Sequence, residues 1–281
     1  MPELPECERG RRILERVAVG RTIEKVTCDD DTIVFSGVTP RRFARALRGR
    51  RAIDTFRRGK YIGLTLDERP WPVFHFGMTG AFEVPGEDSL RLASDRRKGS
   101  SEAAVWPPRF TKVHLRFDDG GELVMTNKRR LGRIRLLEDP EHEPPISELG
   151  FDPLLDPPTP AAFAAMLAKR SVTLKGLLLD QAFAAGVGNW IADEALFQAK
   201  LDPRRRANEL SGEEAKALRR ALLAVIRKAV AVDAEKARFP RTWLFHHRWG
   251  KDTDATSARG EKIEHITVAG RTTAWVPARQ K

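Results

Sequence analysis

The chain begins M-P-E-L-P-E, and this segment holds the residue types needed for amine chemistry. If the initiator Met1 is removed, Pro2 becomes an N-terminal secondary amine. An α-amino group has a pKa of about 7.7–8.0, so a useful fraction of it is unprotonated at neutral pH. Such an amine can attack the electrophilic C1′ of a sugar to form an iminium ion, and Glu3 could carry the protons. Taken alone, the hexapeptide favours an ordinary N-terminus whose prolines open a helix.

A second chemical pattern lies in residues 175–200, which read as two helices joined by a turn that contains Gly186 and Gly188. The first N–H groups of the second helix are free donors at the positive end of a helix dipole, which attracts phosphate. Asn189 is expected to cap that helix and to add a side-chain donor. An ordinary helical hairpin is the alternative, and it is the interpretation adopted for the apolar positions Leu177, Leu178, Ile191, Leu196 and Phe197.

The composition favours a polyanion as partner. Fifty Lys and Arg face 39 Asp and Glu, so the net charge is +11, and the pI is about 10.0. The segment 236–281 holds much of this excess, although ribosomal and chromatin proteins share such a balance. Cys7 and Cys28 are the only cysteines and form no C-x-x-C pair, which argues against a disulfide framework and a thiolate zinc site.

Length and hydropathy bound the class of protein. The 281 residues suit two domains, or one large domain with an appendage. Mean hydropathy is −0.43, and no run approaches the roughly 18 apolar residues of a membrane span. The acidic, proline-bearing start does not resemble a secretory signal, so we expect a cytoplasmic or nucleoid protein if bacterial and a nuclear one if eukaryotic.

The elements that must position these residues follow from the residue pattern. A helix is expected over 5–19, followed by short strands with turn residues between them, at 33–35, 61–65, 73–76, 112–117, 122–125 and 133–137. This pattern predicts an antiparallel sandwich or barrel, with a surface loop at 86–101 and a proline-rich linker from 139.

The second half of the chain reads as helical and ends in a hairpin. Helices are expected at 161–169, 173–183 and 189–200, and a long one begins at the capping box Ser211-x-x-Glu214. Strand-like runs at 262–268 and 271–276 are joined by Ala269-Gly270, which is a hairpin signal.

Several short motifs in this order resemble one family, the Fpg/Nei DNA glycosylases. Besides the first six residues and the Gly-x-Gly-Asn turn, the resemblance rests on R-G-K-Y at 58–61, H-F-G-M-T-G at 75–80, K-R-R-L-G at 128–132, I-S-E-L-G at 146–150 and G-R-T-T at 270–273. It covers nearly the whole chain. It implies an α+β fold with an N-terminal antiparallel β-sandwich (2–138), a linker (139–158), a helix–two-turn–helix domain (159–238) and a C-terminal finger (239–281).

The resemblance also implies roles for single residues. Pro2 would be the nucleophile on C1′, Glu3 the general acid and base, and Glu6 a supporting residue of the same site. The residues implied to contact phosphate are Lys60, which borders the reaction centre, and His75, Lys175, Asn189 and Arg271. Met78 resembles the wedge that fills the gap left by an extruded base, and Arg129 would pair with the orphaned base. Leu131 stands where most relatives have Phe, and an aliphatic wedge can still unstack a base step.

The C-terminal segment departs from most bacterial relatives, which end in a four-cysteine zinc finger. Residues 239–277 resemble instead the zincless finger of plant and fungal enzymes, in which Trp243, Phe245, Trp249 and Trp275 would supply packing in place of a metal. The adjacent His246 and His247 lack further ligands at zinc spacing. The sequence therefore predicts no metal and no cofactor.

These patterns predict a base-excision-repair DNA glycosylase with AP lyase activity by β,δ-elimination. Its partner would be duplex DNA with oxidised bases or abasic sites, and we expect a monomer. The damaged nucleotide must leave the duplex to be reached. Residues 250–260 offer the one candidate for a lid over the base, so we expect activity on abasic sites and further-oxidised purines, with 8-oxoguanine left open. A catalytically silent damaged-DNA-binding or architectural protein and an RNA-binding protein are the alternatives.

Overall fold

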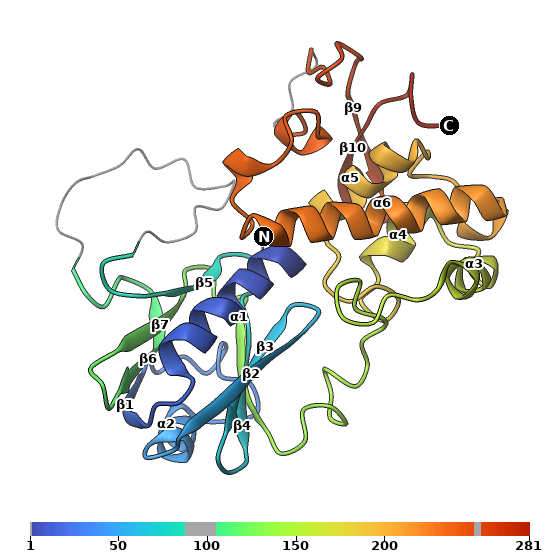
Figure 1. The fold of residues 1–281 in the computed structure, drawn as a ribbon. Coiled ribbons are helices and arrows are strands. Elements are labelled where there is room, and N and C mark those ends of the chain that lie inside the picture. The colour runs from blue at the N-terminus through green and yellow to red at the C-terminus, as the bar shows by residue number, and fades with distance from the viewer. Residues whose placement is uncertain (1, 88–104, 250–253) are drawn as a thin grey trace. The chain divides into compact units, whose positions relative to one another are not determined.

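The computed structural model describes residues 2–87, 105–249 and 254–281, and the chain divides into two compact units (Figure 1). The first unit comprises residues 1–2 and 6–148, and the second comprises residues 3–5 and 149–281. Most of the predicted loop at 86–101 and the beginning of the stretch at 250–260 lie outside the described residues. The division at 148/149 falls inside the predicted linker, and the four-part domain scheme stays a prediction.

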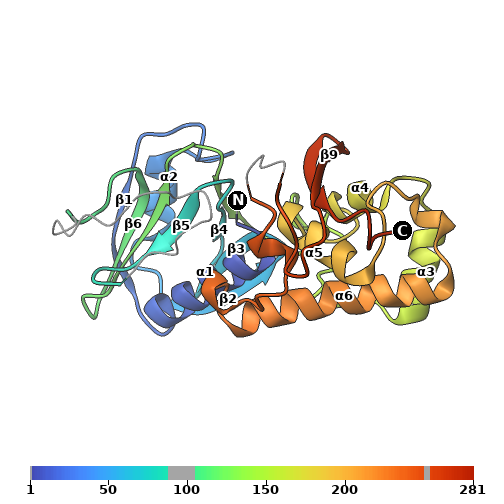
Figure 2. The same ribbon diagram turned by 90° about the horizontal axis from the view of Figure 1, so that it is seen from above.

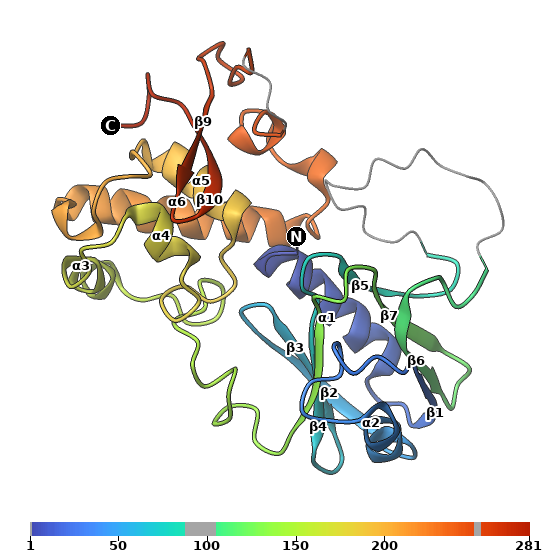
Figure 3. The same cartoon turned by 180° about the vertical axis from the view of Figure 1, so that it is seen from behind.

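Two four-stranded antiparallel sheets form the body of the first unit (Figures 1 and 3). The first sheet has the order β1-β6-β7-β5, with bounds Ile23–Cys28, Thr111–Phe117, Glu122–Asn127 and Gly80–Glu83. The second has the order β2-β3-β4-β8, with bounds Ala52–Arg58, Tyr61–Leu66, Trp71–His75 and Arg133–Leu137. The helices are α1 (Leu4–Ala18) and α2 (Pro40–Leu47).

One hydrophobic core joins both sheets and both helices of this unit. Leu14 of α1, Phe43 of α2, Val113 of the first sheet and Phe74 of the second belong to the same buried cluster. Apolar surface removed from water in this way stabilises a fold by about 25 cal/mol per Å². The α+β class with an antiparallel sandwich is confirmed.

The local predictions for this unit were wrong at one place and incomplete at two others. Residues 33–35 are not a strand, because the carboxylate of Asp31 accepts hydrogen bonds from the N–H groups of Ile33 and Val34 and holds a turn there. The helix α2 was missed, although Thr39 caps its first turn and Pro40 is its first residue. The same Thr-Pro pair, Thr159-Pro160, begins the helix that was predicted from 161. The short or charged strands β1, β2 and β5 were missed as well.

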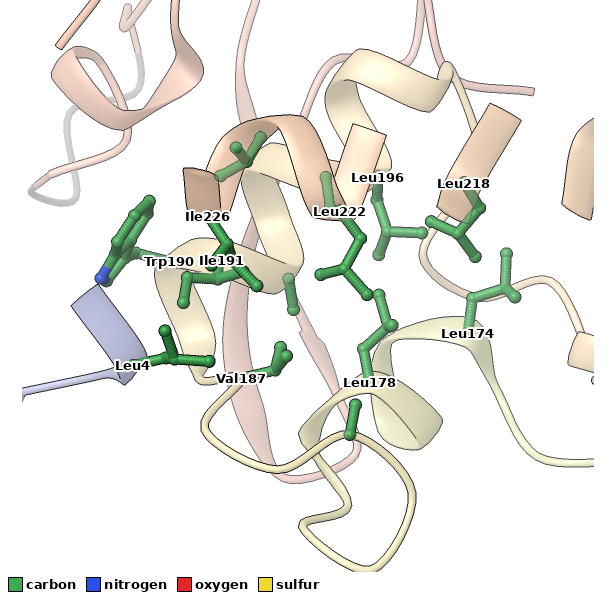
Figure 4. Close-up of a cluster of buried hydrophobic side chains, with 14 of the residues drawn as sticks. Leu4, Leu174, Leu178, Val187, Trp190, Ile191, Leu196, Leu218, Leu222 and Ile226 are labelled. Atoms are coloured by element: carbon green, nitrogen blue, oxygen red, sulfur yellow. The ribbon is translucent and has the colours of Figure 1, made fainter. Parts of the chain in front are cut away.

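The second unit is mainly helical and contains α3 (Pro160–Ala168), α4 (Leu174–Leu179), α5 (Asn189–Ala199) and α6 (Gly212–Ala231). Short 3-10 turns lie at Ala207–Glu209, Lys236–Arg238 and Leu244–His246. Both halves of the predicted capping box are present at the start of α6, which packs along α5 (Figure 2). Their apolar faces meet in a cluster that also takes in Leu4 (Figure 4).

A two-stranded hairpin completes the second unit. Strands β9 (Glu264–Val268) and β10 (Arg271–Trp275) are joined by Ala269 and Gly270, whose φ angles are 50° and 70°. Two successive left-handed residues are the signature of a type I′ turn, so the predicted hairpin is confirmed. Strand β10 lies against α5. Among the helices of the described residues, none combines the length and apolar character that crossing a bilayer requires.

Candidate active site

Glu3 occupies the N-terminal end of α5. Its carboxylate oxygens accept hydrogen bonds from the backbone N–H groups of Trp190, at 2.9 Å, and Ile191, at 3.1 Å, and the residue is only 2% exposed. These donors suit an anionic group at the positive end of a helix. The N–H groups of Trp190 and Ile191 are therefore taken by Glu3, and a phosphate contact at this helix end stays a prediction for Asn189.

The glycines of the turn before α5 make room for this arrangement. A Cβ on Gly188 would lie 2.3 Å from the carboxyl carbon of Glu3, and Gly186 has a φ of +89° beside Leu4. The N–H of Leu4 donates to the carbonyl oxygen of Gly186 at 3.0 Å. Gly188, not Asn189, is the N-cap of α5. The Gly-x-Gly pattern thus serves to seat residues 3 and 4.

Lys175 lies in a buried charge network instead of at the surface. Its side chain is 0% exposed, and its Nζ donates to the carbonyl oxygen of Asn189 at 2.9 Å and to the carboxylate of Asp193. Burial lowers the pKa of Lys175, and Asp193 opposes that effect. The predicted phosphate contact of Lys175 is corrected on this ground: its ammonium group is committed inside the unit, where it positions the start of α5.

Asp193 connects this lysine to the C-terminal finger. Its Oδ2 accepts from Nε of Arg248 at 3.1 Å and from the N–H of Ala274 in β10 at 3.2 Å. Nearby, Nδ2 of Asn189 donates to the carbonyl oxygen of Thr272 at 2.9 Å, so this amide ties α5 to the hairpin. Arg271, at the hairpin turn, keeps an exposed side chain. The network holds the finger so that Arg271 faces solvent.

Aromatic packing also stabilises the finger, and all four predicted residues take part in ring contacts, three of them buried and one partly exposed. Trp243 and Phe245 are buried in the helical core, and the guanidinium of Arg204 lies 4.4 Å from the ring centroid of the buried Trp275. Trp249 is 47% exposed, and its ring still packs edge-on against Phe245 with the ring centroids 5.3 Å apart. In the described part of the chain no group of three or more His, Cys, Asp or Glu is arranged to hold a metal ion.

In the first unit, Pro2 is buried in a small hollow with Glu6. Arg9 and Gly10 of α1 and Phe76 are among the other lining residues. Glu6 is 4% exposed. A Cβ on Gly10 would lie 2.7 Å from the ring of Phe76, so only glycine allows this close approach. The predicted pair Pro2 and Glu6 is thus brought together on one side of α1.

Lys60 and His75 lie close to each other at the ends of β3 and β4. Burial, together with the nearby positive charges of Lys60, Arg135 and Arg133, lowers the pKa of His75 to about 4. Nδ1 of His75 accepts a hydrogen bond from the N–H of Gly77 at 3.2 Å, so the proton of the neutral imidazole resides on Nε2. That N–H is a donor for an anionic oxygen.

Met78, Arg129 and Leu131 lie on two loops that are tied together. The N–H of Arg129 donates to Oγ1 of Thr79 at 3.2 Å, and a Cβ on Gly77 would lie 2.4 Å from the carbonyl carbon of Leu131. Leu131 is 43% exposed, and Arg129 is exposed too. The structure therefore brings these predicted contact residues onto one surface of the first unit.

Two buried side chains that the sequence analysis missed support this surface. Asn127, 0% exposed, donates from Nδ2 to the carbonyl oxygen of Phe76 at 2.9 Å and accepts at Oδ1 from the N–H of Gly132 at 3.2 Å. Burial alone would raise the pKa of Asp31, but hydrogen bonds from Arg130 and Lys112 hold it well below its usual range. Their signals in the sequence are weak: Asn127 follows the run L-V-M-T, and Asp31 is the last of three consecutive aspartates.

Comparisons with known proteins cover nearly the whole chain. Residues 1–134 match the family described as Formamidopyrimidine-DNA glycosylase N-terminal domain, and residues 149–241 match the Formamidopyrimidine-DNA glycosylase H2TH domain. The formamidopyrimidine-DNA glycosylase of Arabidopsis thaliana is 44% identical over 100% of this chain and 71% of its own length. The enzyme of Heliobacterium modesticaldum is 36% identical over the full length of both chains.

Solved structures give the same result. The Lactococcus lactis formamidopyrimidine-DNA glycosylase, bound non-covalently to DNA with an AP site, matches with a TM-score of 0.80 and 25% identity over 99% of each chain. A MutM structure in complex with DNA that contains carbocyclic 8-oxo-G matches with a TM-score of 0.80 and 26% identity over 100% of each chain.

Proposed function

The chain belongs to the formamidopyrimidine-DNA glycosylase family, and on that premise we propose that it excises oxidised bases from duplex DNA through a Schiff base on Pro2. It is a DNA glycosylase of base excision repair, in a family for which AP lyase activity is typical. The observation that carries the proposal is the pairing of Pro2 with a neighbouring Glu3 whose carboxylate is held by two backbone donors.

The first step uses the amine that Pro2 gains when Met1 is removed. Its lone pair forms a bond to C1′ of the damaged nucleotide while the glycosidic C1′–N bond breaks and the base leaves with that electron pair. The carboxylate of Glu3 takes the N–H proton of the amine now bonded to C1′ and passes it to the ring oxygen O4′. The C1′–O4′ bond then breaks, the sugar opens and the iminium ion forms, while the departed base takes a proton from solvent. Because the backbone N–H of Trp190 donates to the carboxylate of Glu3, this carboxylate keeps one position for the proton transfer.

The lyase steps follow from the acidity that the iminium ion gives to C2′–H. Removal of that proton expels the phosphate on C3′, and a second elimination expels the phosphate on C5′, which leaves a gap of one nucleotide. Water then hydrolyses the Schiff base and restores the amine of Pro2. Each elimination requires a general base close to the proton that is removed, and we assign this role to Glu3.

DNA is the partner. The contacts proposed for it are the partly buried Lys60, His75 and Met78 and the exposed Arg129, Leu131 and Arg271, with Met78 and Leu131 as wedge residues. Nε2–H of neutral His75 would donate to a phosphate oxygen, because a depressed pKa keeps the ring uncharged near neutral pH. We propose that the protein acts as a monomer on abasic sites and further-oxidised purines. An excision series in which 8-oxoguanine opposite C is removed fastest of all lesions would contradict that preference.

The decisive experiment is borohydride trapping of untagged protein on a duplex with one abasic site, followed by intact mass and N-terminal peptide mapping. We expect a covalent adduct on Pro2 that is absent in Pro2→Gly and in protein that retains Met1. Pro5→Ala is the matched control, since it removes a proline of the same segment that lies in α1. Tight binding without an adduct, despite removal of Met1, would support a silent damaged-DNA-binding protein instead.

A further inference from the structure

Phe110 is an aromatic residue that the first unit holds at the surface. It directly precedes β6, and 37% of it is exposed although most large aromatic side chains of this unit are buried. It belongs to no hydrophobic cluster of the described residues. Removing a ring of this size from water is favourable, so its exposure calls for a physical explanation.

The backbone at Phe110 is strained in a way that fixes the ring outward. Its φ angle is 71°, in the left-handed region that bulky residues rarely adopt. The carbonyl oxygen of Phe110 accepts a hydrogen bond from the N–H of Asn127 at 3.0 Å, and Thr111 closes the turn through Oγ1 to the carbonyl oxygen of Pro108 at 2.7 Å. Strain that the surroundings maintain is concentrated at functional sites.

Two cations flank the ring. The guanidinium carbon of Arg109 lies 4.8 Å from its centroid and the Nζ of Lys128 lies 5.9 Å from it, both within the range of a cation–π contact. An exposed ring with cationic groups beside it has the composition of a nucleic-acid stacking platform, in which the ring contacts a base or sugar and the cations contact phosphate.

The place of this ring in the unit indicates which nucleotides it would meet. Lys128 is followed by Arg129, the residue proposed to pair with the orphaned base, and Leu131 is exposed on the same loop. The backbone hydrogen bond from Asn127 joins Phe110 directly to the start of that loop. We infer that Phe110, Arg109 and Lys128 form a platform that binds the strand opposite the damaged nucleotide, next to the orphaned base. This inference rests on the proposed function.

The test compares variants that keep the left-handed backbone. Asn and His both tolerate that conformation, so Phe110→Asn removes the ring and Phe110→His retains an aromatic one. For a duplex with a tetrahydrofuran abasic analogue, we expect Kd by fluorescence anisotropy to rise about 10-fold in Phe110→Asn, which is about 1.4 kcal/mol, and to stay within about threefold in Phe110→His. Ile53→Asn, at a 49% exposed position in β2, is the matched control and should bind as the wild type does.

Two further measurements separate a DNA platform from other roles. The double variant Arg109→Gln with Lys128→Gln should reduce the salt slope of binding by about two, since each cation would release counterions from a phosphate. Trapping on Pro2 at protein concentrations below the Kd should slow in Phe110→Asn in proportion to its loss of binding and keep the wild-type rate in Ile53→Asn. A Phe110→Asn protein that is folded by circular dichroism and binds within twofold of the wild type would overturn the inference. Failure of the proposed function would differ, since the wild type itself would then give no adduct.

Discussion

The two units of this protein hold their proposed contact residues by different means. In the first unit, Met78, Arg129 and Leu131 project from loops that a buried neutral side chain, Asn127, ties together with hydrogen bonds. In the second unit, a buried chain of charges through Asp193 and Arg248 holds the hairpin, and Arg271 at its turn is exposed.

This difference indicates how sensitive each unit is to the loss of a single buried side chain that supports its contact residues. Burying a neutral amide costs little free energy once its hydrogen bonds are made. The loops of the first unit are therefore held in place at a small cost in stability. Buried charges cost more to remove from water, and they require every partner to be present. The finger of the second unit should therefore be the more sensitive of the two to a single substitution in its support.

The largest effect is expected for Asp193→Asn. The substitution leaves the buried ammonium of Lys175 and the guanidinium of Arg248 without their common carboxylate. Breaking a buried ion pair in this way destabilises by about 3–5 kcal/mol. Urea unfolding should show that loss, whereas Asp202→Asn, which removes a partner of the solvent-exposed Arg204, should cost about 0–1 kcal/mol. Equal losses in the two variants would remove the distinction between the units.

A pH effect is expected at Glu194, which accepts hydrogen bonds from the N–H of Phe245 and from Gln198 in the second unit. Burial raises the pKa of Glu194 to about 7. Because the folded pKa lies above the unfolded value, its contribution to stability is complete below about pH 4.5 and is lost as the pH rises through 7.

Unfolding free energies measured from pH 5 to pH 8 would test this effect. The wild type should lose about 1–3 kcal/mol over that range relative to Glu194→Gln, which cannot ionise. The amide of Gln can still accept the hydrogen bond from Phe245, so the finger is preserved in the control. Parallel pH profiles for the two proteins would show that burial does not set the ionisation of Glu194.

A smaller loss of stability with a clear loss of binding is expected for Asn127→Ala. The carbonyl oxygen of Phe76 and the N–H of Gly132 would lose their partner in the core of the first unit, at a cost of about 1–3 kcal/mol. The loops that carry Met78 and Arg129 would then separate. Affinity for an abasic-site duplex should fall together with stability, while Thr126→Ser, a change on the neighbouring residue that retains its hydroxyl, should preserve both.

The smallest effect on stability is expected for Arg271→Gln. This side chain is exposed at the hairpin turn, so the free energy of unfolding should stay within about 0.5 kcal/mol of the wild type. If Arg271 contacts phosphate, the slope of log K against log salt should fall by about one. An unchanged slope would remove Arg271 from the DNA contacts and leave the hairpin as a structural element.

Much of the local structure was predictable because its signals lie within a few residues. Thr159 and Ser211 cap α3 and α6 as their patterns predict, and the turn at Ala269-Gly270 produces the hairpin. The strands that were missed carry weaker signals. Strand β2 reads A-I-D-T-F-R-R, with charges that interrupt the alternation, and β5 has only four residues. Pairing with longer neighbours makes these segments strands, and propensity alone does not.

The site was predictable in its residue types and less so in their surroundings. Pro2, Glu3 and Glu6 were chosen from six residues of sequence, because a proline amine and nearby carboxylates suggest one chemistry wherever they occur. The prediction that Lys175 lies at the surface was wrong. It was made because a lysine in a basic protein is usually an exposed cation. Its burial depends on Asp193, and the sequence offered no measure of that pairing.

By itself, the sequence determined the family, the helices with strong caps, the final hairpin and the amine that could do chemistry. Only the tertiary structure decided which charges are buried, that Glu3 takes the first donors of α5, and that Phe110 stands exposed in a left-handed conformation. The physical reason is distance along the chain. Caps and turns are set by neighbours three or four residues away, whereas Glu3 and Trp190 are 187 positions apart and meet only when the second unit is folded.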